Sequence, residues 1–298
     1  MKDQNKILGA LFGVAIGDAL GAPLEFMSAE TIKQKRGTVT DMIGGGWLNV
    51  EPGEITDDTQ MTIAVAEGIV EKPTDPYQAI GRHFIEWYDS RPKDIGNCCR
   101  AVIADTKQSN AKTLQDWLAC SDRYDVQSGG QSAGNGALMR AIYPILYYGN
   151  DKSGFEISDN IGRMTHWHEH SRMSIRVYHE IIADIITGKL NDTASLTNLS
   201  HYMKGITKAV NFNNLQPNGY APFALMYSVQ ALQSNKGFES ALIEIVNNGG
   251  DADTIGAIAG GLLGAWHGFD SIPKRWIDTL DKDIVKRLNE LAEIAMQV

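Results

Sequence analysis

The 298-residue sequence has little cysteine, little proline and no excess of basic residues. Its three cysteines, Cys98, Cys99 and Cys120, are odd in number and two are adjacent, so they predict reduced thiols in a cytoplasmic protein. No Cys-x-x-Cys pair is present, which argues against a zinc knuckle or a thioredoxin motif. With nine prolines and no linker rich in Pro, Gly and Ser, we expect one domain over residues 1–298.

The charge balance is acidic, with 27 Lys and Arg against 36 Asp and Glu. A net charge of −9 argues against general binding to nucleic acid or to anionic membranes. No uncharged apolar run reaches about 18 residues, which argues against a transmembrane helix. The apolar stretch 7–16 resembles a signal peptide only weakly, because Asp18 interrupts the region that follows. We therefore expect no membrane partner.

Helical periodicity dominates the chain and predicts an all-α fold, a single compact multi-helix bundle. The predicted helices are Ile7–Leu20, Gln60–Val70, Tyr77–Tyr88, Ala137–Tyr147, Ser174–Thr187, Pro222–Gln233, Phe238–Asn247, Thr254–Gly268 and Asp281–Met296. The best candidate strand is Thr38–Ile43.

Glycine is abundant, with 30 residues, and part of it is periodic. Two predicted helices carry a glycine every fourth residue: Gly9, Gly13, Gly17 and Gly21 in the first, and Gly256, Gly260 and Gly264 in the second. A glycine inside a helix costs about 1 kcal/mol relative to alanine, so the repetition indicates very close backbone packing. Core packing alone explains this pattern. The glycine stripes would also serve function if this close packing holds the acidic residues at the helix ends in fixed positions.

Two acidic stretches, residues 54–59 (Glu-Ile-Thr-Asp-Asp-Thr) and 249–254 (Gly-Gly-Asp-Ala-Asp-Thr), each directly precede a predicted helix. Asp and Thr there could simply cap the helices. One carboxylate is enough for a cap, however, and each stretch offers two carboxylates and a hydroxyl. If the stretches meet, their repulsion calls for a divalent cation, and oxygen ligands favour Mg²⁺, Mn²⁺ or Ca²⁺ over zinc or copper.

Seven blocks from about Ile7 to Trp266 resemble the ADP-ribosylglycohydrolase family, typified by dinitrogenase reductase-activating glycohydrolase and the ADP-ribosylarginine hydrolases. They occur in the family's order at residues 9–21 with Glu25 and Phe26, 56–59, 94–97, 132–140, 165–166, 219–220 and 249–254. The resemblance implies an all-α hydrolase that cleaves the N- or O-glycosidic bond between ADP-ribose and a protein side chain, most often arginine. It also implies a centre of two Mg²⁺ or Mn²⁺ ions that holds the distal ribose, with the ligands Thr56, Asp57, Asp58, Asp251, Asp253 and Thr254.

The same resemblance implies roles for residues around these ions. Glu25 and Asp94 match positions of acid–base catalysis, which glycosidic cleavage requires. Asp94 could instead orient a leaving guanidinium, or cap the segment 97–104. The residues expected to bind ADP-ribose are Asn97, Ser132, Gly134, Asn135, His166 and Tyr220.

Several features of these blocks keep a simpler explanation. The loop Gly129–Gly136 could cradle a pyrophosphate through backbone N–H groups or could just be flexible. Tyr220 could be an ordinary core aromatic, and Arg140 fits a structural ion pair better than a phosphate contact. The histidines of residues 166–170 lack a zinc-binding spacing, and a loop before a helix cap at Ser171 explains them.

Other functions stay open on the sequence. The chain could bind and neutralise an ADP-ribosyltransferase partner, act as a phosphatase with the same ions, or be a retired enzyme, although its intact acidic stretches count against retirement. The substrate could be an ADP-ribosylated protein or a free derivative such as O-acetyl-ADP-ribose.

Overall fold

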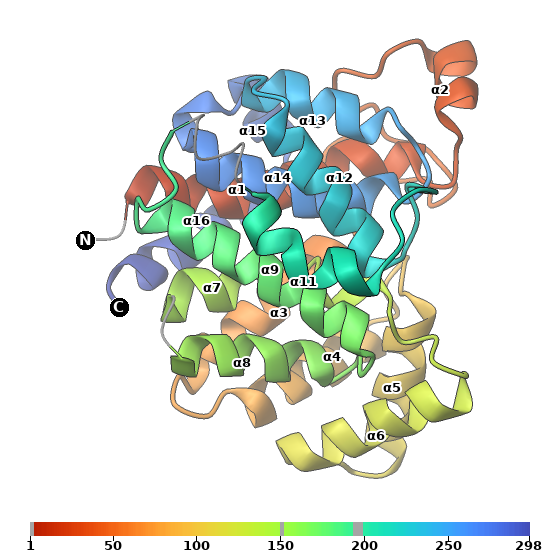
Figure 1. Cartoon of the computed structure of the whole chain (residues 1–298), viewed down its shortest axis with the longest axis vertical. Helices are drawn as coiled ribbons and strands as arrows, with labels where there is room; N and C mark the ends of the chain where they lie inside the picture. The colour runs from red at the N-terminus through yellow and green to blue at the C-terminus, as the bar shows by residue number, and fades with distance from the viewer. Residues whose placement is uncertain (1–2, 150–151, 193–198) are drawn as a thin grey trace.

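A computed structural model describes residues 3–149, 152–192 and 199–298, and this part of the chain is built from helices joined by irregular segments (Figure 1). The α-helices are α1 Gln4–Gly21, α2 Ala29–Arg36, α3 Asp57–Glu71, α4 Tyr77–Asp89, α5 Asn97–Gln108, α6 Leu114–Gln127, α7 Ile142–Tyr148, α8 Lys152–Arg163, α9 Glu169–Ile186, α11 Ser200–Ala209, α12 Ala221–Gln233, α13 Phe238–Val246, α14 Ala252–His267, α15 Lys274–Thr279 and α16 Lys282–Met296. Short 3₁₀ turns occupy Ala22–Leu24, Asn135–Ala137 and Phe269–Ser271. Extended pairing in the described ranges is limited to isolated bridges, so the predicted all-α class is confirmed.

Helices α1 and α14 lie side by side in the centre of the bundle and run antiparallel (Figure 1). A Cβ atom added to Gly13 would lie 2.0 Å from the carbonyl oxygen of Gly260, and one added to Gly17 would lie 2.0 Å from that of Gly256. The glycine stripes therefore face each other, as the close-packing interpretation expects. Because the helices are antiparallel, the end of α1 meets the start of α14.

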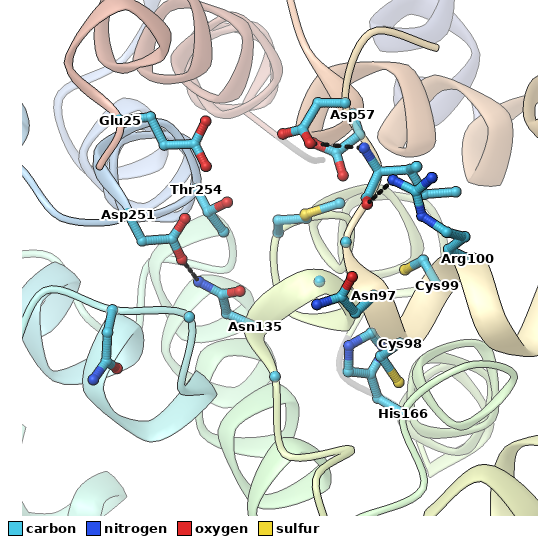
Figure 2. Close-up of a pocket in the computed structure, with 18 of the residues that line it drawn as sticks. Glu25, Asp57, Asn97, Cys98, Cys99, Arg100, Asn135, His166, Asp251 and Thr254 are labelled. Carbon is cyan, nitrogen blue, oxygen red and sulfur yellow. Dashed lines mark hydrogen bonds between the residues drawn. The ribbon is translucent and has the colours of Figure 1, made fainter. Parts of the chain in front are cut away.

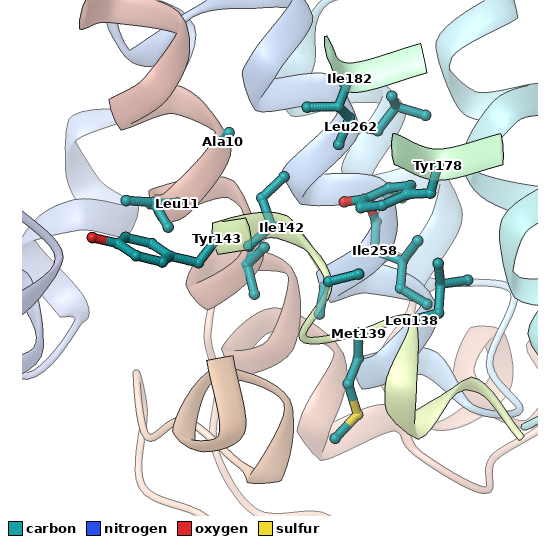
Figure 3. Close-up of a cluster of buried hydrophobic side chains, with 14 of the residues drawn as sticks. Ala10, Leu11, Leu138, Met139, Ile142, Tyr143, Tyr178, Ile182, Ile258 and Leu262 are labelled. Atoms are coloured by element: carbon teal, nitrogen blue, oxygen red, sulfur yellow. The ribbon is translucent and has the colours of Figure 1, made fainter. Parts of the chain in front are cut away.

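The surrounding helices bury apolar side chains against this central pair (Figure 3). Leu11 and Ile258 come from α1 and α14, and Ile142 and Ile182 from α7 and α9. Tyr178 is buried among them, and its hydroxyl donates a hydrogen bond to the carbonyl oxygen of Ile258 at 3.0 Å. The core thus anchors α9 to α14 through both packing and a satisfied polar group.

Two local predictions were wrong. Residues 38–43 form no strand, since the backbone of Val39 bonds on both its N–H and C=O to the side chain of Asn247. The helix predicted from residue 137 begins only at Ile142, because a 3₁₀ turn over Asn135–Ala137 precedes it.

The stretch Gln4–Leu24 is long and apolar enough to cross a membrane by length and composition alone. However, 94% of its most apolar 18-residue part is buried inside the fold, as in the core helix of a globular protein.

Candidate active site

A cleft of about 680 Å³ opens where the end of α1 meets the starts of α3, α5 and α14 (Figure 2). Glu25, Asp251 and Thr254 line one side, and Asp57 and Asn97 line the other. Three helix N-termini, with their partial positive charge, therefore surround a site rich in carboxylates. The antiparallel packing of α1 on α14 is what brings Glu25 next to the second acidic stretch.

The two acidic stretches meet, together with both acid–base candidates. Carboxylate oxygens of Glu25, Asp94 and Asp253 lie within 4.8 Å of one another. Asp58, buried below the cleft, interacts electrostatically with Asp251 and Asp253. The cluster thus combines residues from four separate parts of the chain.

Helix capping does not explain these acidic residues. Thr56 and Asp251 occupy the N-cap positions of α3 and α14, yet neither side chain makes a capping hydrogen bond. Asp251 instead accepts a hydrogen bond from Nδ2 of Asn135 at 2.6 Å. The N-cap of α5 is Gly96, so Asp94 does not cap that helix either.

The cluster carries more negative charge than its buried setting stabilises. Burial, together with repulsion from neighbouring carboxylates, raises the pKa of Asp57, Asp58 and Asp253 well above its ordinary value. Burial likewise raises the pKa of Glu25 to about 7. Oδ1 of Asp58 is buried and has no hydrogen-bond partner among the described residues. A divalent cation would stabilise the charged carboxylates and give this orphaned oxygen a partner, so the donor set fits Mg²⁺ or Mn²⁺.

Asp18, which the sequence motifs do not single out as a site residue, lies beneath this cluster. It is fully buried on α1 and accepts hydrogen bonds from the backbone and hydroxyl groups of Thr56 and Thr59, at 2.5–3.1 Å. The Thr56 hydroxyl also lies 3.2 Å from Oδ2 of Asp58. Asp18 therefore holds the first turn of α3 in place. The sequence signal that could have identified Asp18 is its position as a charged residue in the apolar, glycine-striped helix.

Four of the predicted ADP-ribose contacts, Asn97, Gly134, Asn135 and His166, line the cleft. The His166 ring is buried, and its Nδ1 lies 2.7 Å from Oγ1 of Thr165. Burial, with the nearby Arg140 guanidinium, lowers the pKa of His166 to about 3, so this imidazole is neutral.

Two predicted contacts lie elsewhere. Ser132 is buried and does not line the cleft; its hydroxyl donates to Asp125 at 2.6 Å and accepts from the backbone N–H of His168 at 2.9 Å. Tyr220 lines a neighbouring pocket of about 480 Å³, and its hydroxyl lies 2.5 Å from Nδ1 of His170. Their roles in binding ADP-ribose stay predictions.

Two neighbouring features are structural. Arg140 makes no ion pair in the described chain; its guanidinium donates to Gly136 O and to Thr165 Oγ1, the latter at 2.7 Å, and lies over the Phe84 ring. The histidine-rich segment starts α9 with His168, rather than Ser171, at the N-cap, where its Nδ1 accepts from the N–H of His170.

The all-α bundle thus places a cluster of carboxylates in a cleft at its helix ends, an arrangement that suits acid–base hydrolysis of a glycosidic bond. The family model described as ADP-ribosylglycohydrolase matches residues 1–298, and the chain belongs to this family. It is an ADP-ribosyl glycohydrolase, an enzyme that hydrolyses glycosidic bonds of ADP-ribose.

Individual relatives match along most of their length. The chain is 33% identical over 297 residues to ADP-ribosyl-(dinitrogen reductase) glycohydrolase of Rhodospirillum rubrum, covering 96% of this chain and 93% of that protein. It is 28% identical to ADP-ribosylarginine hydrolase Tri1 of Serratia proteamaculans, covering 97% and 78%. A solved structure described as an ADP-ribosylglycohydrolase-related protein complex superposes with a TM-score of 0.81 at 26% identity, covering 98% of this chain and 99% of that one.

Proposed function

We propose that this enzyme removes ADP-ribose from arginine side chains of modified proteins, and that it uses two Mg²⁺ or Mn²⁺ ions. The observation that carries the proposal is the meeting of both acidic stretches with Glu25 and Asp94 in one cleft. Two similar proteins bear names that specify ADP-ribosyl-(dinitrogen reductase) and ADP-ribosylarginine as substrates, which supports a modified protein side chain as the target.

The proposed ligands of the ions are Thr56, Asp57, Asp58, Asp251, Asp253 and Thr254. When bound, the ions would supply positive charge that holds the ribose hydroxyls beside the anomeric carbon. The chain's own contribution is to preorganise these oxygens. Asp18 holds Thr56, and Asn135 holds Asp251 through the 2.6 Å hydrogen bond.

Glu25 and Asp94 are the proposed acid–base groups. Hydrolysis adds the hydroxyl of water to the anomeric carbon, breaks the bond to the guanidinium nitrogen, and delivers a proton to that nitrogen. One carboxylate takes the proton from water, and the other carboxyl group donates a proton to the leaving nitrogen. The indole N–H of Trp47 donates to Oε2 of Glu25 at 2.5 Å and so orients this carboxylate in the cleft.

The test compares release of ADP-ribose from arginine-, serine- and cysteine-linked substrates, with and without a chelator. Asp253→Ala should abolish release and Mn²⁺ binding in titration calorimetry while leaving the helical circular dichroism intact. The exposed Asp283→Ala on α16 is the matched control and should behave as wild type. Unchanged release by Asp253→Ala would refute the metal assignment, and release from serine or cysteine substrates but not arginine would refute the proposed target.

A further inference from the structure

Exposed aromatic side chains gather at the mouth of the cleft. Of the five large hydrophobic residues that are exposed in the described chain, Phe26, Ile43 and Trp47 all belong to the segment between α1 and α3. Phe26 is 70% exposed and Trp47 53% exposed, and both line the cleft, whereas Ile43 does not. The two rings lie 5.3 Å apart, centre to centre. Apolar surface left exposed at a site of chemistry points to a ligand.

The backbone holds Phe26 in this exposed position at a cost. Its φ of +61° lies in the left-handed region, which a bulky residue seldom adopts. The N–H of Phe26 donates to the carbonyl of Gly250 at 2.6 Å, and the N–H of Gly250 donates to the carbonyl of Met27 at 2.7 Å. The strained turn is thus fastened to the second acidic stretch, and the Phe26 ring is placed beside the predicted ligands.

Trp47 is held by the residue that precedes Phe26. Its indole N–H donates to Glu25 Oε2, so its polar group is satisfied by a residue of the candidate acid–base pair. The half-exposed ring stays available for contact at the mouth of the cleft. A group seated against Phe26 and Trp47 therefore lies next to Glu25, one of the two proposed acid–base groups.

The charge of the site favours a cation at this position. Apart from Asp18, whose oxygens already accept hydrogen bonds from Thr56 and Thr59, six carboxylates belong to the cleft and to the cluster beneath it: Glu25, Asp57, Asp58, Asp94, Asp251 and Asp253. Two divalent ions would neutralise four of these charges and leave two. Arg100 also lines the cleft, where its guanidinium donates to the carbonyl oxygen of Ile95 at 3.2 Å and offsets part of the negative charge of Asp94, so about one negative charge remains. Aromatic faces beside excess negative charge bind guanidinium groups well.

We propose that Phe26 and Trp47 form a platform for the guanidinium of the ADP-ribosylated arginine, and that this platform makes the enzyme prefer a cationic leaving group over a neutral one. The inference rests on the proposed function and adds residues that determine specificity. It assigns the aromatic pair to the protein side of the substrate, outside the part of the cleft that holds ADP-ribose.

The test uses Phe26→Leu, which keeps an apolar side chain but loses the aromatic face. KM for an ADP-ribosyl-arginine peptide should rise about fivefold, with kcat within a factor of about two. KM for an ADP-ribosyl-serine peptide and the Kd of free ADP-ribose should not change. Ile43→Ala is the matched control, because Ile43 is exposed in the same segment but does not line the cleft.

A second variant separates the platform from the positioning of Glu25. Trp47→Phe retains a ring but loses the hydrogen bond to Glu25, so kcat should fall by more than KM rises. Phe26→Leu should unfold within about 3 °C of wild type, because its ring is mostly exposed. An unchanged KM for the arginine peptide, or an equal rise for the serine peptide, would overturn the inference. A wild-type enzyme that binds free ADP-ribose but does not act on the arginine peptide would instead show that the proposed function itself is wrong.

Discussion

The contact between the glycine stripes offers a stringent test, through the substitution Gly13→Ala. The added methyl group would lie 2.0 Å from the carbonyl oxygen of Gly260 and 2.6 Å from its carbon. An ordinary contact needs about 3.4 Å, so α1 and α14 must separate by roughly 1.4 Å at this point. The obstacle is backbone, which cannot rotate away as a side chain can.

The expected cost follows from two opposed effects. Overpacking a rigid core costs roughly 1–3 kcal/mol, and the upper end applies here because the two backbones collide. Alanine regains about 1 kcal/mol of helix propensity over glycine. We therefore expect Gly13→Ala to lower the free energy of unfolding by about 2 kcal/mol or more, measured by urea denaturation.

A matched control is available in α11. A Cβ on Gly205 would meet only the end of the Met173 side chain, at 3.7 Å, so Gly205→Ala should leave stability unchanged or raise it by up to about 1 kcal/mol. Separation of α1 from α14 should also move Glu25 away from Asp251 and weaken Mn²⁺ binding in the Gly13 variant. If Gly13→Ala is as stable as Gly205→Ala, the packing argument fails.

Three further outcomes are expected. Asp18→Asn should lower the free energy of unfolding by about 2–4 kcal/mol, because the new amide NH₂ group would face the N–H and hydroxyl donors of Thr56 and Thr59. Thr59→Val, which removes one of these donors, should lower it by less. Unchanged unfolding of Asp18→Asn in urea would contradict this role of Asp18. Asn135→Leu should weaken Mn²⁺ binding about 10-fold in calorimetry by removing the hydrogen bond to Asp251, and an unchanged affinity would count against it. The low pKa of His166, about 3 in the fold against 6.5 when exposed, means that the unfolded chain takes up a proton that the folded chain rejects, so the contribution of His166 to the free energy of unfolding should fall as pH drops below 6.5. Between pH 6.5 and 5 this contribution falls by about 2 kcal/mol, and it should appear as the difference between the unfolding free energies of wild type and His166→Gln over this pH range.

Sequence periodicity predicted α1, α3, α4, α12, α13, α14 and α16 well, because amphipathic or glycine patterns are local properties, but it missed α5, α6 and α8 and started α9 five residues late. It failed where tertiary contacts decide the backbone. Residues 38–43 look like a strand but bond to the side chain of Asn247, more than 200 residues away. The start of α7 was placed five residues early, since the turn at Asn135 depends on a backbone bond to Gly219.

For the site, the ordered blocks of motif residues sufficed to predict the family and most of the carboxylates, because each block is short and its chemistry depends on residue type. Only the tertiary structure showed that residues 56–58 and 251–254 meet, that Asp18 supports them, and that Phe26 and Trp47 stand at the mouth while Ser132 does not line the cleft. The physical reason is the range of the interactions. A helical pattern in the sequence depends on contacts between residues a few positions apart. The meeting of these segments depends instead on the antiparallel packing of two glycine-striped helices that are about 240 residues apart in the chain.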